Sequence, residues 1–305
     1  MDAPTSGAQP SGSPGGRVSV DQPAVSIVLP VHNGEAYLAD ALESILAQTF
    51  TEFELIAVDD CSTDRSPAIL SEHAARDPRM RVITLRQNRK LPGALNAGFE
   101  TARAPWFTWT SDDNLLLPGT LEDLLAERDA YPDADILYAD YRVIDAEGRT
   151  GRRVSVKPAA DILTGNCIGC CFVYRREVDQ ALGGYDEGLF GVEDYDFWLR
   201  AARAGFTMQP INRELYLYRR HERSLTDQRT VEIRRMVADV LEREIAMTPE
   251  RAKRAAGWLA LFVSEPYTPQ IRHLTRAILA SPWLVLKGWR DLAIWARRAI
   301  GWRIR

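Results

Sequence analysis

The stretch VSIVLPVHNGEAYLADALESILAQTFTEFELIAVDDCSTD, residues 25–64, determines the expected fold. It opens with a continuous apolar and β-branched run, Val25–Val31, which predicts a strand buried on both faces. Apolar positions then recur at helical spacing from Tyr37 to Leu46, which predicts an amphipathic helix. A second apolar run, Phe53–Val58, comes next. A strand, a helix and a second strand in this order predict a parallel βαβ unit.

The alternation of strands and helices continues along the chain. Arg81–Leu85 and Trp106–Thr110 are further apolar runs, and Leu91–Arg103 between them has a helical pattern. Repeated alternation is typical of α/β proteins, in which helices cover both faces of a mostly parallel sheet. The sequence therefore predicts an α/β domain at residues 24–226, followed by a helical region at residues 227–305.

Polar side chains follow three of the expected strands. Asn33 and Glu35 follow the first, Asp59–Asp64 the second, and Asp112–Asn114 the fourth. Ligands of parallel sheets bind outside the carboxyl ends of the strands, so these groups should converge. The adjacent carboxylates of the last group repel unless a cation, hydrogen-bond donors or water relieves them. Such oxygen ligands suit Mg²⁺ or Mn²⁺ with substrate phosphates, although an Asp-Asp pair alone also occurs in turns and helix caps.

Two later segments complete the set of motifs. They are LPGALNAGFETARAPWFTWTSDDN at residues 91–114 and GVEDYDFWLRAARAG at residues 191–205. Together with residues 25–64, they resemble a family two glycosyltransferase of the GT-A fold across about two-thirds of the chain. The resemblance implies a mixed, mostly parallel sheet and metal-dependent transfer of a sugar from a UDP- or dTDP-linked donor. The SDDN segment, residues 111–114, corresponds to a TDDN/SDDN variant of the family's D-x-D motif.

The resemblance also implies a donor site. Asp60 would accept a hydrogen bond from the N–H of the base, and Asp112 would face the ribose or the sugar. Asp113 and His221 would hold the divalent metal. The full set implied for nucleotide-sugar binding is Pro30, Val31, His32, Asn33, Glu35, Asp60, Asn88 and Asp112.

Catalysis is assigned by the resemblance to Asp194. A sugar hydroxyl is a poor nucleophile at neutral pH, so transfer needs a base within hydrogen-bond reach. The sequence supplies one such base and no evident covalent nucleophile, which favours inversion. Glu193, Gly169 and Cys170 are expected on the side of the acceptor, a glycan or lipid-linked hydroxyl in polysaccharide or cell-envelope biosynthesis. A cap of the following helix is the alternative role for Asp194.

Two other functions use a similar layout. A sugar-phosphate nucleotidyltransferase would usually carry a Gly-rich, basic phosphate loop near the first strand, and none is visible after Val31. A non-catalytic nucleotide-sugar-binding or scaffold protein is disfavoured because Asp113, Asp194 and His221 are all present. Zinc is weakly indicated by one CxxC motif, and we expect Cys170 to lie in a strand beneath the acceptor pocket instead.

Composition narrows the class of protein. The net charge of −4 over 305 residues argues against a nucleic-acid binder. Four cysteines offer no disulfide framework, which favours a reducing compartment and a cytoplasmic location. Residues 1–23 are rich in Gly, Ser and Pro without an apolar core, so they are expected to be a disordered tail and not a signal.

The end of the chain combines tryptophan with basic residues. Residues 283–305 predict an amphipathic helix with one basic face and one apolar face. The basic face carries Lys287, Arg290, Arg297, Arg298 and Arg305, and the apolar face carries Val285, Trp289, Leu292, Trp295, Ala299 and Trp302. This composition favours peripheral attachment to an anionic membrane, here the inner face of the plasma membrane. Packing on the catalytic domain or on a second subunit is the alternative, and the oligomeric state stays open.

Overall fold

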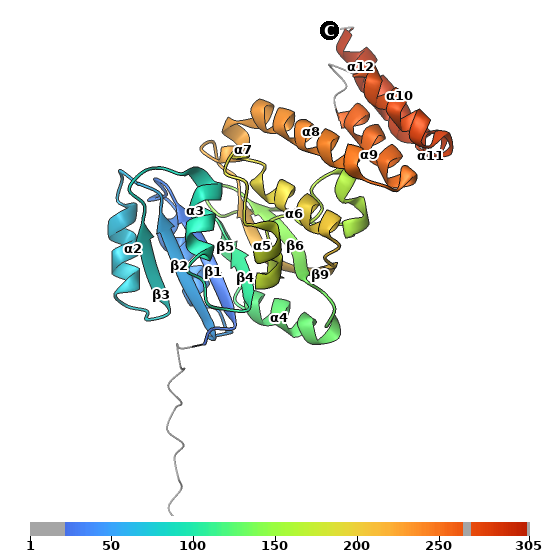
Figure 1. Cartoon of the computed structure of the whole chain (residues 1–305). Helices are drawn as coiled ribbons and strands as arrows, with labels where there is room; N and C mark the ends of the chain where they lie inside the picture. The colour runs from blue at the N-terminus through green and yellow to red at the C-terminus, as the bar shows by residue number, and fades with distance from the viewer. Residues whose placement is uncertain (1–21, 265–269, 304–305) are drawn as a thin grey trace, which may run out of the picture.

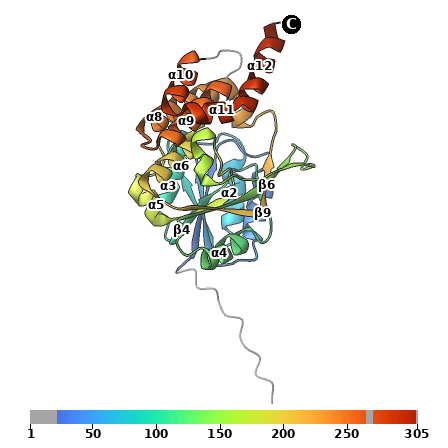
Figure 2. The same ribbon diagram turned by 90° about the vertical axis from the view of Figure 1, so that its right-hand side faces the viewer.

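The computed structural model describes residues 22–264 and 270–303. In this part of the chain a nine-stranded mixed sheet has helices on both faces and a helical region beyond one edge (Figures 1 and 2). The strand order is β3-β2-β1-β4-β8-β6-β9-β5, and β7 pairs with β6 alone. The predicted α/β architecture with C-terminal helices is therefore confirmed. The predicted tail, residues 1–23, lies almost wholly outside the described residues.

The first four strands form the parallel half of the sheet. They are β1 (Val25–Val31), β2 (Phe53–Asp59), β3 (Met80–Thr84) and β4 (Trp106–Trp109). β1 pairs with β2 and β4, and β2 pairs with β3, in each case in parallel. All residues of β1 and β2 are buried, because helices cover both faces. This burial explains why these strands are continuous apolar runs and not alternating ones.

Helices from both sides close the core of the sheet. One face packs on α1 (Leu38–Leu46), α2 (Ser66–Ala74) and α4 (Thr120–Ala130), and the other on α3 (Lys90–Phe99), α5 (Arg176–Leu182) and α6 (Glu193–Ala204). Along β1 the side chains alternate between these faces, as the period of a strand requires.

The predicted helix at residues 91–103 ends four residues too late. α3 ends at Phe99 because the chain must turn into β4, and Pro105 disfavours helical backbone at the residue before it.

The second half of the sheet contains the antiparallel pairs. Its strands are β5 (Leu115–Leu116), β6 (Ile136–Ile144), β7 (Thr150–Val154), β8 (Phe172–Arg175) and β9 (Met208–Arg219). β6 pairs in parallel with β9 and antiparallel with β7 and β8. The 3-10 helix η1 (Ala159–Thr164) follows β7. Cys170 precedes β8, so its expected place within a strand was wrong; the turn that begins at Gly169 (φ 76°) positions it before the strand begins.

The helical region extends from one side of the sheet toward the upper right of Figure 1. It comprises α7 (Leu225–Gln228), α8 (Thr230–Met247), α9 (Arg251–Ser264), α10 (Ile271–Ala280), α11 (Pro282–Lys287) and α12 (Trp289–Arg303). None of the described helices is long and apolar enough to cross a membrane. The domain boundary near residue 226 stays a prediction.

The predicted single helix at residues 283–305 is broken at Gly288 into α11 and α12. A Cβ at Gly288 would lie 2.8 Å from Cδ2 of Leu259, so the break rests directly on α9. The apolar face expected to be free for a membrane is partly covered by the protein itself. Val285 is buried, and Trp295 packs on Phe262 with ring centroids 4.6 Å apart.

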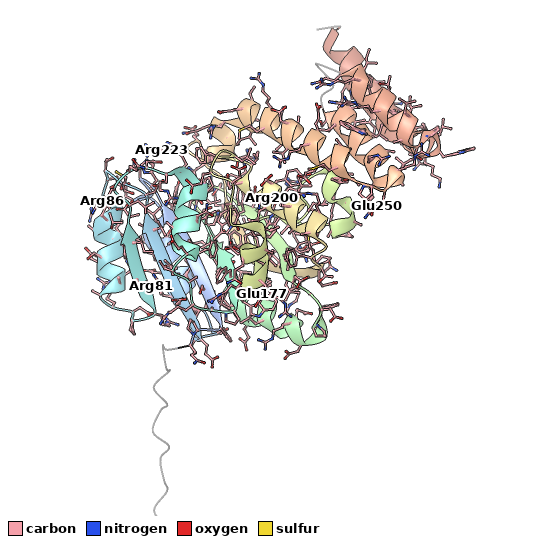
Figure 3. All side chains as sticks on the ribbon, viewed as in Figure 1. Arg81, Arg86, Glu177, Arg200, Arg223 and Glu250 are labelled. Atoms are coloured by element: carbon pink, nitrogen blue, oxygen red, sulfur yellow. The ribbon has the colours of Figure 1, made fainter. Side chains whose placement is uncertain are left out.

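α6 and α8 are joined by buried charge. The carboxylate of Asp196 on α6 is 1 % exposed and pairs with Arg200 at 2.6 Å. Figure 3 labels Arg200 between the sheet and the helical region. Arg243 of α8 pairs with the same carboxylate, and Arg203 of α6 pairs with buried Glu244 of α8 at 3.0 Å. The helical region is therefore fixed to the helix that begins at Glu193.

Candidate active site

A cavity of about 290 Å³ lies at the carboxyl edge of the sheet. Its wall includes the end of β4 and the loop after it, the segment before β8, strand β9 and the first turn of α6. The wall holds five of the residues predicted from the sequence, which are Asp113, Gly169, Cys170, Glu193 and Asp194. The structure thus brings the predicted metal, base and acceptor-side residues to one place.

Asp113 is paired on one side only. Its Oδ2 lies 3.0 Å from Nε2 of His221, while its Oδ1 is buried and has no hydrogen-bond partner. The backbone N–H of Arg223 donates to Nδ1 of the same ring at 3.3 Å, so Nε2 is the nitrogen that faces the carboxylate. An unpartnered buried oxygen is costly unless a cation or a donor reaches it.

The donor set of this pair fits a hard divalent cation with few protein ligands. The described residues contain no cluster of three or more His, Cys, Asp or Glu that could hold a metal. Mg²⁺ and Mn²⁺ sites on nucleotide enzymes commonly use one or two protein ligands, with substrate phosphates and water completing the shell. Asp113 and His221 match that pattern.

Asp112 lies against the loop after β1. A Cβ at Gly34 would approach its Oδ2 to 2.1 Å, so only glycine allows this contact. Burial and the charge of Asp113 raise the pKa of Asp112 to about 7. Burial also raises the pKa of Asp113, and the hydrogen bond from His221 opposes that shift. The raised pKa values mean that two negative charges at this edge of the sheet are unfavourable unless a cation or a proton compensates them.

Three of the predicted donor-binding residues are neighbours. Nδ1 of His32 donates to the carbonyl of Asp60 at 2.8 Å, and Nδ2 of Asn88 lies 3.1 Å from Nε2 of His32. The carboxylate of Asp60 is buried and accepts the N–H of Arg89 at 2.6 Å. The three residues connect the loops that follow β1, β2 and β3.

Left-handed backbone marks the same loops. Asn33, Cys61 and Lys90 have φ values of 57°, 65° and 64° although none is glycine. Such backbone costs energy and clusters at functional sites. Asn33 is held by the N–H of Thr63, which donates to its Oδ1 at 2.8 Å.

The other predicted donor-binding residues shape these loops from within. The carboxylate of Glu35 accepts the N–H of Arg65 at 3.0 Å, which ties the first loop to the start of α2. Pro30 and Val31 are buried in β1, and the carbonyl of Val31 accepts the N–H of Asp60 at 2.8 Å. These three residues hold the loops in place, and any contact with a donor stays a prediction.

Glu193 and Asp194, the acidic pair at the start of α6, both have raised pKa values. Glu193 is buried, and burial together with the charge of Asp194 raises the pKa of Glu193 to about 8. Burial also raises the pKa of Asp194, but its oxygens accept the N–H of Tyr195 at 2.7 Å and Nδ2 of Asn166 at 2.9 Å. Hydrogen bonds of this kind favour the charged form. Of the two carboxyl groups, Glu193 therefore holds a proton more tightly, and Asp194 is the one whose charged form receives hydrogen bonds from side-chain and backbone donors.

Several lining residues were not singled out from the sequence. They are Trp109, Tyr141, Asn166, Tyr216 and Tyr218. Tyr216 and Tyr218 lie two residues apart on β9 and so face the same side, a period-two signal that the LYLYRRH segment does carry. Asn166 has no comparable signal, because its role depends on a contact with a residue 28 positions away.

The chain is similar in sequence to known proteins over more than half of its length. Residues 26–183 match Glycosyl transferase family 2, which is more than half of the chain. Uncharacterized protein y4gI from Sinorhizobium fredii is 37% identical over 183 residues, 58% of this chain and 20% of that protein. O-antigen biosynthesis protein RfbC from Myxococcus xanthus is 32% identical over 200 residues, 64% and 16% respectively. Uncharacterized glycosyltransferase EpsJ from Bacillus subtilis is 30% identical over 220 residues, which cover 67% of this chain and 63% of that protein. The chain thus spans a fifth or less of the first two relatives.

Solved structures share the fold at lower identity. TarS 1-349 of S. aureus in complex with UDP-GlcNAc superposes with a TM-score of 0.66 at 20% identity, covering 86% of this chain and 80% of that one. The mannosyltransferase PcManGT from Pyrobaculum calidifontis, in complex with GDP-Man and Mn²⁺, superposes with a TM-score of 0.61 at 19% identity, covering 92% and 80%.

The proton on Glu193 generates a prediction about pH. Its pKa is raised from 4.5 to about 8, so the folded state binds the proton more tightly than the unfolded state does. The resulting stabilisation is complete below pH 4.5 and is lost as pH rises toward 8. Glu193→Gln should therefore flatten the pH dependence of the unfolding free energy over this interval, measured by urea unfolding. Glu177→Gln, on the exposed surface of α5 (Figure 3), should leave the slope unchanged. Equal slopes for Glu193→Gln and the wild type would contradict the assignment.

Proposed function

The chain belongs to Glycosyl transferase family 2, and we propose that it moves a sugar from a UDP- or dTDP-linked donor to a hydroxyl of a glycan or lipid-linked acceptor, with inversion. One observation carries this proposal. The unpartnered oxygen of Asp113 and the hydrogen-bonded carboxyl group of Asp194 line the same cavity. An electrophile can therefore be held beside a base. The name of RfbC, an O-antigen biosynthesis protein, supports a role in polysaccharide or cell-envelope biosynthesis.

The donor enters along the loops that follow β1 and β2. The buried carboxylate of Asp60 accepts the N–H of the base, and the imidazole of His32 is held nearby by its hydrogen bond to the backbone carbonyl of Asp60. Asp113 and His221 would hold a divalent Mg²⁺ or Mn²⁺, which would supply positive charge for the departing diphosphate. The TarS complex with UDP-GlcNAc and the PcManGT complex with GDP-Man and Mn²⁺ support a nucleotide-sugar donor and a metal.

The acceptor hydroxyl meets Asp194. As its oxygen bonds to the anomeric carbon, the bond from that carbon to the diphosphate breaks, and the hydroxyl proton passes to the carboxylate of Asp194. Glu193, protonated and directly before it, adds no second negative charge at neutral pH. Because a single displacement by the acceptor needs no covalent enzyme intermediate, the sugar inverts.

The C-terminal helices offer an apolar surface with basic neighbours. Leu279, Trp283, Leu286 and Trp289 are 78%, 76%, 63% and 61% exposed, and the guanidinium of Arg290 lies 5.8 Å from the ring of Trp289. These four residues, the C-terminal ridge, follow one another through α10, α11 and the start of α12. Exposed tryptophan beside Lys and Arg suits the interface of an anionic membrane, so we assign the ridge to peripheral attachment at the cytoplasmic face.

The first prediction here concerns the base. Asp194→Asn keeps the shape of the side chain but cannot take a proton, so kcat should fall by about 10²–10⁴-fold with donor affinity nearly unchanged. Initial rates of UDP release and titration calorimetry with UDP-sugars measure the two effects. Asp40→Asn on the exposed side of α1 should change neither. If Asp194→Asn kept more than about a tenth of the wild-type kcat, Asp194 would be a helix cap only. Release of pyrophosphate in place of UDP would indicate a nucleotidyltransferase.

The second prediction concerns the metal. Asp113→Ala removes the unpartnered oxygen, so it should abolish turnover and the enhancement of UDP binding by Mn²⁺. Calorimetric titration of UDP with and without Mn²⁺ gives a readout that does not depend on activity. Equal affinity of the wild type for UDP in both conditions would refute the metal site.

The third prediction concerns the C-terminal ridge. Trp283→Ser with Leu286→Ser should lower binding to phosphatidylglycerol vesicles by about tenfold or more, since apolar burial is lost. The electrostatic part, about 1 kcal/mol per basic residue, should weaken with salt. Flotation with phosphatidylglycerol and phosphatidylcholine vesicles measures both. Val231→Ser, exposed on α8, is the matched control. Point variants are preferable to deletion of residues 282–305, because deletion would uncover Phe262 and Leu259 of α9.

A further inference from the structure

A second cavity lies beside the active site. It has a volume of about 140 Å³, is open to solvent, and is lined by the end of β7, the segment after it and η1. Tyr141, Asn166 and Gly169 line this cavity and also line the active-site cavity. The two cavities therefore have one wall in common, and nothing in the donor site accounts for the second.

The common wall is closely fitted. Gly169 has φ 76°, and a Cβ there would lie 2.9 Å from Cε1 of Tyr141. Asn166 turns its amide nitrogen to Asp194 at 2.9 Å, while its Oδ1 accepts the N–H of Ile168 at 3.2 Å. Asn166 is exposed to solvent, so it contacts Asp194 and borders the second cavity without closing one cavity off from the other. A molecule that presents a hydroxyl to Asp194 can extend past Asn166 into this space.

The second cavity carries both signs of charge. Lys157 and Asp161 line it, and neither forms an ion pair with any residue in the described part of the chain. Ser155 and Thr164 add hydroxyl groups, and Tyr141 adds an aromatic ring. Such a wall can donate to and accept from a neutral polyhydroxylated ring. An anionic group would meet the carboxylate of Asp161, and a cationic group would meet Lys157.

We infer that this cavity is a subsite for the second sugar unit of an oligosaccharide acceptor, the unit next to the one that carries the reacting hydroxyl. The inference rests on the proposed function. Binding of a unit remote from the reacting centre helps to orient the hydroxyl at Asp194, so it raises kcat/KM of transfer. The acceptor is therefore at least a disaccharide, and a monosaccharide fills only the first cavity.

The test compares acceptors of increasing length. The probes are p-nitrophenyl mono-, di- and trisaccharides of the gluco, galacto, manno and N-acetylgluco series, with UDP-, dTDP- and GDP-sugars as donors. For the wild type, kcat/KM should rise by about tenfold or more from the monosaccharide to the disaccharide of the series that reacts. Thr164→Trp introduces a bulky side chain into the second cavity, so it should reduce kcat/KM for the disaccharide to the value for the monosaccharide.

Two further variants separate occupancy from damage. Lys157→Met keeps the length of the side chain without its charge and should lower kcat/KM for the disaccharide in the same direction. Thr150→Trp places the same bulk on an exposed residue of β7 outside the cavity and should change neither acceptor. Donor hydrolysis by water and affinity for UDP should be equal in all four proteins, which shows that Thr164→Trp is folded and its donor site intact.

The outcomes are distinct. Equal kcat/KM for mono- and disaccharides in the wild type, or an unchanged disaccharide rate in Thr164→Trp, overturns the subsite. Donor hydrolysis without transfer to any saccharide overturns it as well, while the proposed function stands. A third outcome is that Asp161→Asn transfers faster to a phosphate-bearing acceptor and that Lys157→Met loses this transfer. The cavity would then bind an anionic group, and the saccharide subsite would be overturned. If the protein neither binds nor hydrolyses any nucleotide sugar, the proposed function itself has failed.

Discussion

The concentration of carboxylates at one edge of the sheet is the constraint on which the rest of the site depends. Asp113, Glu193 and Asp194 line one cavity, and no lysine or arginine of the described chain lines it with them. Like charges so close cannot all persist in a partly dry site. The structure relieves them in three different ways: a proton on Glu193, two hydrogen bonds to Asp194, and an imidazole beside Asp113 whose second oxygen still lacks a partner. Each kind of relief gives its carboxylate a different chemical role.

The same helix links this site to the rest of the molecule. α6 begins with the acidic pair, buries Phe197 and Trp198 under the sheet, and carries the buried carboxylate of Asp196 toward α8. Arg243 of α8 pairs with the buried carboxylate of Asp196, and Arg203 of α6 pairs with buried Glu244, so ion pairs in both directions hold α8 on α6. α8 therefore braces the helix that begins with Glu193 and Asp194, while α10, α11 and α12 carry the exposed ridge. Attachment through the ridge would orient the cavity relative to a surface.

Residues near one another in the sequence were predictable, and residues that meet through long-range packing were not. The burial of strands β1 to β4 could be predicted from their composition, because a strand covered on both faces is apolar along most of its length. The acids that follow them were expected at the edge for the same topological reason. The C-terminal helix was predicted with its tryptophans on one face, yet Trp295 turns inward to Phe262 while Trp289 stays exposed. Amphipathic spacing indicates a face, but only a packing partner decides whether that face is covered.

By itself the sequence determined the type of sheet, the strand ends that bear carboxylates, and the segments that supply the residues predicted to bind the donor and metal and to act as base. These features are local, since they depend on apolar period and on the residues directly after each strand. The tertiary structure alone decided which carboxylate holds the proton, because burial and hydrogen bonds that set a pKa come from distant segments. It also decided that Asn166 joins Asp194 to a second cavity. Distances between side chains far apart in the chain exist only after the sheet and helices have packed, and no pattern along the sequence contains them.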